Sequence, residues 1–120
     1  MLDDIPKIMS TEQVAQYRET VLQLVVEPRL LEFVARVVNE TRNNPSLYLG
    51  ASPRASLAIV RAAKAFAAIR GRDFVTPEDI IEVIPHVLRH RIILTPEKEM
   101  EGMTPDDLIQ KIIKSVEIPR

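Results

Sequence analysis

The sequence contains no cysteine, only three glycines and no long uninterrupted apolar run. The absence of cysteine excludes disulfides, thiolate metal sites and cysteine nucleophiles. Neither of two glycine-rich phosphate-binding patterns, G-x-x-x-x-G-K-[ST] and G-x-G-x-x-G, is present. No stretch of about 18 uncharged apolar residues occurs, which predicts that no helix crosses a membrane. The chain alone therefore has no phosphate loop of these kinds with which to hold a nucleoside triphosphate.

The length and composition are those of one ordinary folded domain. The chain has 120 residues, of which 46% are apolar and 28% are charged. Its first residues are acidic and do not resemble a secretory signal. The net charge is −1, but residues 29–91 carry ten positive and six negative side chains, a net charge of +4. This basic segment is either an anion-binding surface or an ordinary solvated one, and charge alone favours the second.

Helix start signals and apolar spacing predict a mainly α-helical bundle of four principal helices, with an extra helix at the C-terminal end. Ser10, Thr76 and Thr104 are typical helix caps, and proline opens several helices, where its missing N–H costs nothing. The predicted helices cover residues 11–23, 28–42, 53–70, 77–90 and 105–116. The third of these is rich in alanine and apolar on most sides, which is typical of a central helix.

The segments between these helices are predicted to be loops, apart from two short strands. Residues 24–26 and 92–94 are apolar and β-branched, and we expect them to pair with each other. Residues 43–51 and 95–103 are predicted loops. Pro85 is expected to kink or split the fourth helix.

The segment Gly50-Ala51-Ser52-Pro53-Arg54 stands at the predicted start of the alanine-rich helix. Ser52 is expected to cap this helix and Pro53 to be its first residue. A helix start carries about half a positive charge, so Arg54 makes the local field still more positive. The arrangement becomes favourable when an anion meets the free N–H groups, the dipole and the guanidinium together. Gly50 and Ala51 would let such an anion approach the turn closely.

Helical spacing extends the positive charge along the same helix. At about 100° per residue, Arg61 lies within about 20° of Arg54 around the axis, and Lys64 within about 80°. The spacing predicts a basic stripe on one side of the helix. This stripe is either part of an anion site or simply the only solvated face of the helix, and spacing alone leaves both open.

Three blocks of sequence resemble the C-terminal lid of MoxR-family AAA+ ATPases. They read Y-L-G-A-S-P-R-A-S-L over residues 48–57, R-G-R-D-F-V-T-P-E-D-I over 70–80 and V-L-R-H-R over 87–91. The blocks follow the family's order and spacing, over roughly residues 5–100. In that family the arginine of the first block is the sensor 2 residue. The resemblance therefore implies that Arg54 contacts the phosphates of ATP bound in a neighbouring AAA+ core and reports the nucleotide state to the lid.

The resemblance also implies that much of the machinery lies outside this sequence. Residues 1–9 would be the linker from the AAA+ core, and residues 10–120 would be the lid. The family's Walker A, Walker B, sensor 1 and arginine finger are absent here, so we expect a fragment, with a natural free-standing lid as the less favoured alternative. In either case the chain is expected to be inactive alone. ATP and Mg²⁺ are expected as cofactors of the full-length protein, with none bound tightly by this fragment.

The partners implied by the resemblance are the protein's own AAA+ core and further copies in a homo-hexamer. Such a machine is cytoplasmic, has chaperone-like or maturation roles and often works with a protein that carries a von Willebrand factor A domain. We expect no membrane association and no nucleic-acid partner.

A second basic cluster is formed by Arg89, His90 and Arg91. These residues, like Arg61, are candidates for contact with the core or a neighbouring subunit, but the cluster is equally suited to capping the fourth helix. His86 and His90 are four residues apart, a spacing that metal sites use, but no third ligand is apparent. A structural role is therefore expected for both histidines, and no metal site.

A second class of function stays open at this point. Residues 75–80, after a long helix, also resemble the end of a histone-fold subunit, which would make the chain a helical pairing or DNA-binding module. The long loop over 43–52 and the near-neutral charge argue against it. The sequence contains no apparent catalytic carboxylate pair. Glu78 and Asp79 are adjacent, but both are acidic residues of the kind that a helix start favours. Tyr17 and Phe33 are predicted to be core residues rather than a stacking platform.

Overall fold

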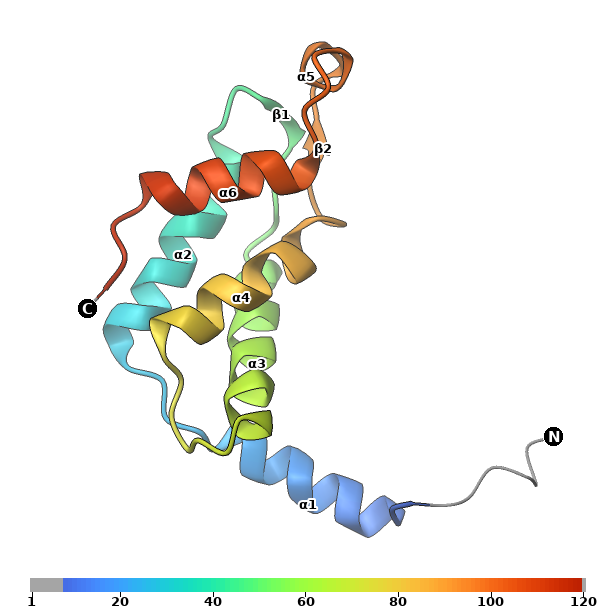
Figure 1. Ribbon diagram of the computed structural model, residues 1–120, viewed down its shortest axis with the longest axis vertical. Coiled ribbons are helices and arrows are strands. Elements are labelled where there is room, and N and C mark those ends of the chain that lie inside the picture. The colour runs from blue at the N-terminus through green and yellow to red at the C-terminus, as the bar shows by residue number, and fades with distance from the viewer. Residues whose placement is uncertain (1–7, 120) are drawn as a thin grey trace, which may run out of the picture.

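The computed structural model describes residues 8–119 and confirms the predicted mainly helical fold (Figure 1). Its elements within this range are α1 (Thr11–Leu22), α2 (Pro28–Arg42), β1 (Leu47–Leu49), α3 (Arg54–Ile69), α4 (Pro77–Leu88), β2 (Ile93–Leu94), α5 (Pro96–Met100) and α6 (Pro105–Ser115). Most of the predicted linker over residues 1–9 lies outside the described residues. No helix within residues 8–119 is long and apolar enough to cross a bilayer.

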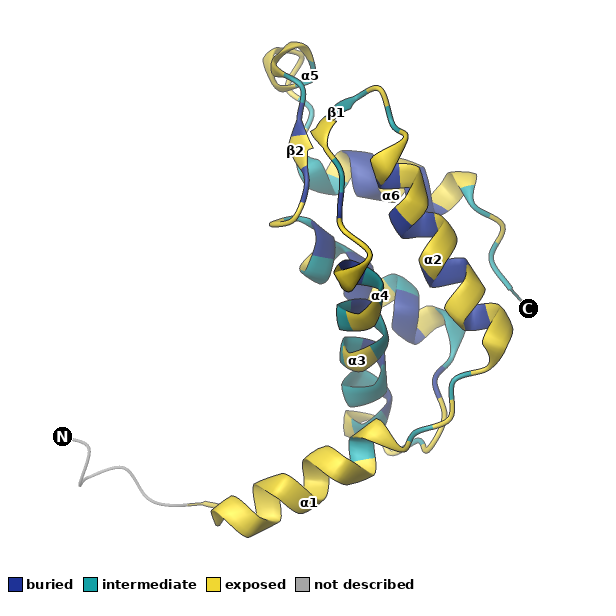
Figure 2. Cartoon of the chain, turned by 180° about the vertical axis from the view of Figure 1, so that it is seen from behind, coloured by how far each residue is buried: buried dark blue, intermediate teal, exposed yellow. Residues whose placement is uncertain are grey.

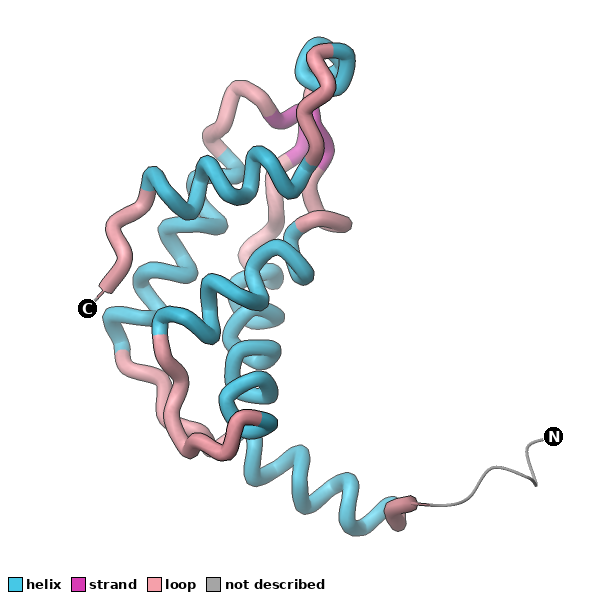
Figure 3. The backbone as a smooth tube through the Cα atoms, viewed as in Figure 1, coloured by secondary structure: helices cyan, strands magenta, loops and turns pink. Residues whose placement is uncertain are grey.

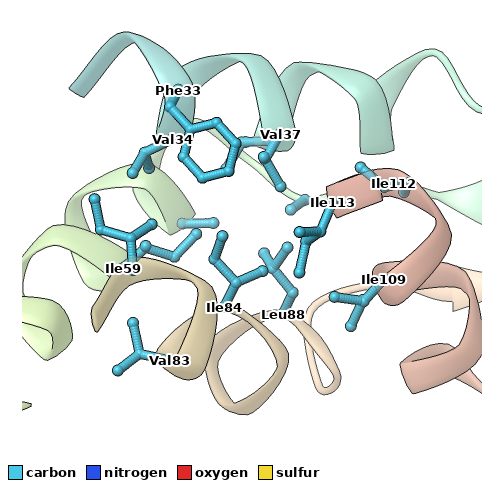
Figure 4. Close-up of a cluster of buried hydrophobic side chains, with 14 of the residues drawn as sticks. Phe33, Val34, Val37, Ile59, Val83, Ile84, Leu88, Ile109, Ile112 and Ile113 are labelled. Carbon is cyan, nitrogen blue, oxygen red and sulfur yellow. The ribbon is translucent and has the colours of Figure 1, made fainter. Parts of the chain in front are cut away.

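The core lies between α2, α3, α4 and α6. α4 packs along α3, and α6 contacts both α2 and α4. Each of these helices contributes aliphatic or aromatic side chains that are fully buried at the centre, among them Phe33, Val34, Val37, Ile59, Ile84, Leu88 and Ile109 (Figure 4). The residues of α3 that complete the core are mostly alanines, which let the neighbouring helices approach closely.

The four helices of this bundle are not the four principal helices that the sequence indicates. α1 has no buried residue and projects from the bundle (Figures 1 and 3). Tyr17 on α1 is 59% exposed, so its prediction as a core residue is wrong, whereas Phe33 is buried as predicted. α6 instead belongs to the core, with Leu108, Ile109, Ile112 and Ile113 buried. Apolar spacing predicts which face of a helix is suited to burial, but it does not predict which other element packs against that face.

The helix caps predicted at Ser10, Thr76 and Thr104 are confirmed. Each pairs with the residue three positions later in a capping box, in which each side chain accepts from the other residue's N–H. The pairs are Ser10 with Gln13, Thr76 with Asp79, and Thr104 with Asp107. Hydrogen bonds from the backbone N–H and hydroxyl of Thr104 lower the pKa of Asp107. This box therefore stabilises the fold above the carboxyl's unfolded pKa, and that contribution is lost as pH falls through the lowered value.

The two strands pair as a small antiparallel sheet, but one partner differs from the prediction. β2 pairs with β1, placing Leu47 opposite Leu94 and Leu49 opposite Ile93. Residues 24–26 do not join this sheet. Val25 instead forms a parallel bridge with Phe74, next to α3 and α4. A segment of three apolar residues is too short for its sequence to specify a strand partner. The pairing depends instead on which segments the packed helices bring together.

Smaller differences concern proline and the loops. Pro85 lies inside α4 without splitting it, and the helix ends at Leu88. The missing N–H of Pro85 removes one helix hydrogen bond, to the carbonyl oxygen of Ile81, while the rest of the helix ladder can form. The predicted loop over 43–51 contains β1, and the one over 95–103 contains the short helix α5, which Thr95 caps.

Candidate functional site

Arg54 is the first residue of α3 and lies on its solvent-exposed side. The residues of α3 that are fully buried form one stripe, made of Ala55, Ile59, Ala63 and Ala67. Arg54, Leu57 and Arg61 lie on the opposite side and are exposed. Most of α3 is otherwise buried or of intermediate exposure (Figure 2). The predicted alignment of Arg54 with Arg61 is thus confirmed. Arg54 makes no ion pair with any residue in the range 8–119.

The start of α3 differs from the prediction in one detail that affects its chemistry. Pro53 occupies the cap position in a helical conformation, with φ −56° and ψ −25°, and no side chain caps the helix. Ser52 is therefore not the cap. The N–H groups of Ala55 and Ser56 donate to the carbonyl oxygens of Ser52 and Pro53, at 2.9 and 3.1 Å. Because these N–H groups are already bonded, the guanidinium and the dipole are the main features here that attract an anion.

Gly50 and Ala51 pack against the end of α2, which gives both residues a structural role. Ala51 is 1% exposed, and its N–H donates to Thr41 Oγ1 at 3.0 Å. A Cβ on Gly50 would lie 2.4 Å from the carbonyl oxygen of Thr41. Glycine is needed because two backbone segments touch. Thr41 is not among the residues predicted from the sequence, although Thr41 continues the apolar spacing of α2 after Val37 and is buried.

Replacing Gly50 by alanine is expected to destabilise the chain by about 1–3 kcal/mol, because the new methyl group meets backbone that cannot rotate away. Urea unfolding of the two proteins measures this difference. Ser52→Ala is the matched control. It is expected to change stability by less than about 0.5 kcal/mol, since Ser52 is exposed and caps nothing. Equal midpoints for Gly50→Ala and the unchanged chain would contradict the tight approach.

Lys64, the third member of the predicted basic stripe, forms a hydrogen bond with α1. Its Nζ donates to the carbonyl oxygen of Leu22 at 2.9 Å, at the C-terminal end of α1. This bond satisfies a carbonyl that the helix itself leaves unpaired. Lys64 therefore helps to hold α1 on α3, and the open part of the stripe consists of Arg54 and Arg61.

The second basic cluster divides between two roles. Arg89 Nη2 lies 3.0 Å from Asp106 Oδ2, and its Nε donates to the carbonyl oxygen of Pro85. Arg89 thus caps α4 and links it to the start of α6, as one of the two interpretations predicted. His90 and Arg91 are exposed. Within the described part of the chain, no three histidine, aspartate or glutamate side chains form a group that could hold a metal ion.

One cavity of the described residues lies apart from Arg54, which is not among its lining residues. It has a volume of about 620 Å³ and lies between α2 and the segment after α6, lined among others by Phe33, Lys114 and Ile118. Arg54 itself lies on an exposed surface. It can contribute one cationic side chain to a site whose other walls come from elsewhere.

Comparison with known proteins shows to which family the chain is related. Residues 39–112 match the family model of the AAA lid domain. The chain is 39% identical to the chaperone MoxR1 of Mycobacterium tuberculosis over 95% of its own length and 33% of that protein. It is 50% identical to the magnesium-chelatase subunit ChlI of Nicotiana tabacum, over 41% of the chain and 12% of that subunit. The crystal structure of a proposed ATPase from Cytophaga hutchinsonii superposes with a TM-score of 0.88 at 35% identity, covering 95% of the chain and 37% of that structure.

The chain belongs to the AAA lid domain family. Its relationship to MoxR-family ATPases extends over nearly its whole length, including α1 and most of α2, which precede the matched residues. The histone-fold alternative is not supported by these similarities. The chain spans about a third of the length of MoxR1, so the rest of such a protein has no counterpart here.

Proposed function

We propose that the chain acts as the sensor 2 lid of a MoxR-like AAA+ ATPase, closing over ATP bound in the core of the full-length protein. The observation that carries this proposal is the position of Arg54, exposed and without an ion pair in residues 8–119, at the positive end of α3. A guanidinium placed there suits a polyphosphate that approaches from another domain. The match of residues 48–57 to the family's sensor 2 block supports the same role.

ATP and Mg²⁺ would be held mainly by the AAA+ core. Among the described residues, Arg54 suits a phosphate oxygen, but no acidic cluster suits the metal ion. Bound Mg²⁺ would neutralise charge that develops on the phosphates. The contribution of this chain is one cation whose position depends on how the lid is placed. Closing the lid brings Arg54 to the phosphates, and opening it withdraws the charge.

The core is proposed to contact the lid through α1 and through the exposed basic residues. A helix of 12 residues is only marginally stable alone in water, and α1 has no buried residue within the bundle. Packing of its exposed apolar side chains, such as Val14 and Tyr17, against the core would stabilise it. Arg61, His90 and Arg91 are candidates for contacts with the core or with a neighbouring subunit.

The wider role follows from the relatives. MoxR1 is named a chaperone, and by analogy we propose that ATP hydrolysis in the full-length protein drives chaperone-like remodelling or maturation of partner proteins. The working form would be a cytoplasmic homo-hexamer, with a protein carrying a von Willebrand factor A domain as a candidate partner.

Hydrogen exchange measured by mass spectrometry tests the lid assignment. In the protein that includes the AAA+ core, a non-hydrolysable ATP analogue is expected to slow amide exchange over residues 50–57, because the lid closes over the nucleotide. In the isolated chain the same analogue is expected to have little effect there. Residues 105–115 of α6 serve as the internal control. Strong protection in the isolated chain, or none with the core present, would contradict the proposal.

A further inference from the structure

The backbone just before Arg54 is held by a buried hydroxyl at the end of α2. Thr41 is 1% exposed, and its Oγ1 donates to the carbonyl oxygen of Val38 at 2.6 Å. The same oxygen accepts the N–H of Ala51 at 3.0 Å. Both hydrogen-bonding roles of the hydroxyl are thus used inside the protein. Thr41 therefore connects the last turn of α2 to the segment that leads into α3.

The segment between this contact and Arg54 has little conformational freedom. The backbone at Gly50 already touches that of Thr41, since a Cβ there would lie 2.4 Å from the carbonyl oxygen. Pro53 has a fixed φ and is already helical, and Ala55 is fully buried. A displacement of the anchored segment is therefore transmitted to the first turn of α3 instead of being absorbed by a flexible loop.

We infer that Thr41 is a positioning residue for Arg54. By holding Ala51, its hydroxyl fixes where the first turn of α3 begins, and hence where the guanidinium lies when the lid closes. This inference rests on the proposed sensor 2 role. Thr41 is buried. In this inference Thr41 does not contact ATP, and its whole effect on hydrolysis passes through Arg54. Rates are sensitive to such placement, because a misplacement of about 1 Å can cost about 10²-fold.

The test uses the protein with its AAA+ core and compares three variants of Thr41. Thr41→Val keeps the shape but removes both hydrogen bonds, and we expect kcat for ATP hydrolysis to fall about tenfold. Thr41→Ser keeps the hydroxyl and is expected to stay within about twofold of the unchanged protein. Thr41→Cys, whose thiol bonds more weakly, is expected to lie between them and replaces the valine variant if that one does not fold.

A double-mutant cycle separates positioning from a general loss of stability. If Thr41 acts through Arg54, Thr41→Val has no further effect on kcat once Arg54 is alanine. Ile112→Val, a conservative truncation of the buried face of α6, is the matched control. It is expected to lower the thermal midpoint without changing kcat of the folded protein. Faster amide exchange at Ala51 in Thr41→Val would verify that the intended contact has been lost.

The possible outcomes distinguish a failure of this inference from a failure of the proposed sensor 2 role. A fall in kcat with Thr41→Val that disappears in the Arg54→Ala background supports the positioning role. An unchanged kcat, or an equal fall in both backgrounds, overturns it while leaving the sensor 2 role intact. If Arg54→Ala itself leaves kcat unchanged, the sensor 2 role fails and this inference fails with it.

Discussion

Replacing Arg54 by alanine in the protein that carries its AAA+ core is expected to lower ATP turnover by about 10²-fold, the usual effect of removing one preorganised group that stabilises developing charge. The loss should be mainly in kcat, because the guanidinium matters most as charge moves on the phosphates. Steady-state release of phosphate at saturating ATP measures it. Turnover equal to that of the unchanged protein would remove Arg54 from the mechanism.

The same substitution is expected to leave the lid folded. Arg54 is exposed, and its positive charge lies at the end of α3 where the helix dipole disfavours it. Alanine is also the best helix former. The thermal midpoint of Arg54→Ala should therefore be equal to or slightly above that of the unchanged protein, so that a fall in turnover cannot be attributed to unfolding.

Arg61→Ala provides the matched control for the activity measurement. Arg61 lies on the same exposed side of α3, about 10 Å further along the axis, so it has similar charge and exposure but a different reach. Its removal is expected to lower turnover less than the removal of Arg54. An equal effect of both variants would indicate that the exposed side of α3 acts through its overall charge, and not through a specific contact with phosphate.

Local features of the sequence predicted the helices of the bundle well. Thr76 and Thr104 each cap a helix with the aspartate three positions later, and such caps depend only on neighbouring residues. The exposed position of Arg54 also follows from local spacing, because the alanines opposite it form the buried stripe.

The features that were missed depend on contacts between segments distant in the sequence. The sequence predicts that Gly50 lets an anion approach the turn, and the structure shows that Gly50 allows two backbone segments to touch. The sequence predicts that Asp79 is an ordinary acidic residue of a helix start, yet Asp79 is buried and paired with Arg72. In each case the residue type suits both interpretations, and only the packing of the helices selects one of them.

Replacing the buried Asp79 by alanine is expected to cause a large loss of stability, of about 3 kcal/mol or more. Its carboxylate accepts from the Thr76 N–H at 2.9 Å and forms an ion pair with Arg72, while being only 1% exposed. A buried ion pair adds little to stability when formed, but removing one partner leaves the other charge without compensation. The Nε of Arg72 already lacks a hydrogen-bond partner among the described residues, so little else nearby can replace the carboxylate.

The comparison that isolates this ion pair uses the other threonine–aspartate capping box. Asp107 makes the same two hydrogen bonds with Thr104, at 3.0 and 3.1 Å, but it is exposed and forms no ion pair with an arginine of residues 8–119. Urea unfolding of Asp107→Ala should therefore show a clearly smaller loss than that of Asp79→Ala, since only the cap is removed. Similar losses in the two variants would mean that Asp79 stabilises the fold as a cap alone, and that its pairing with Arg72 contributes nothing measurable.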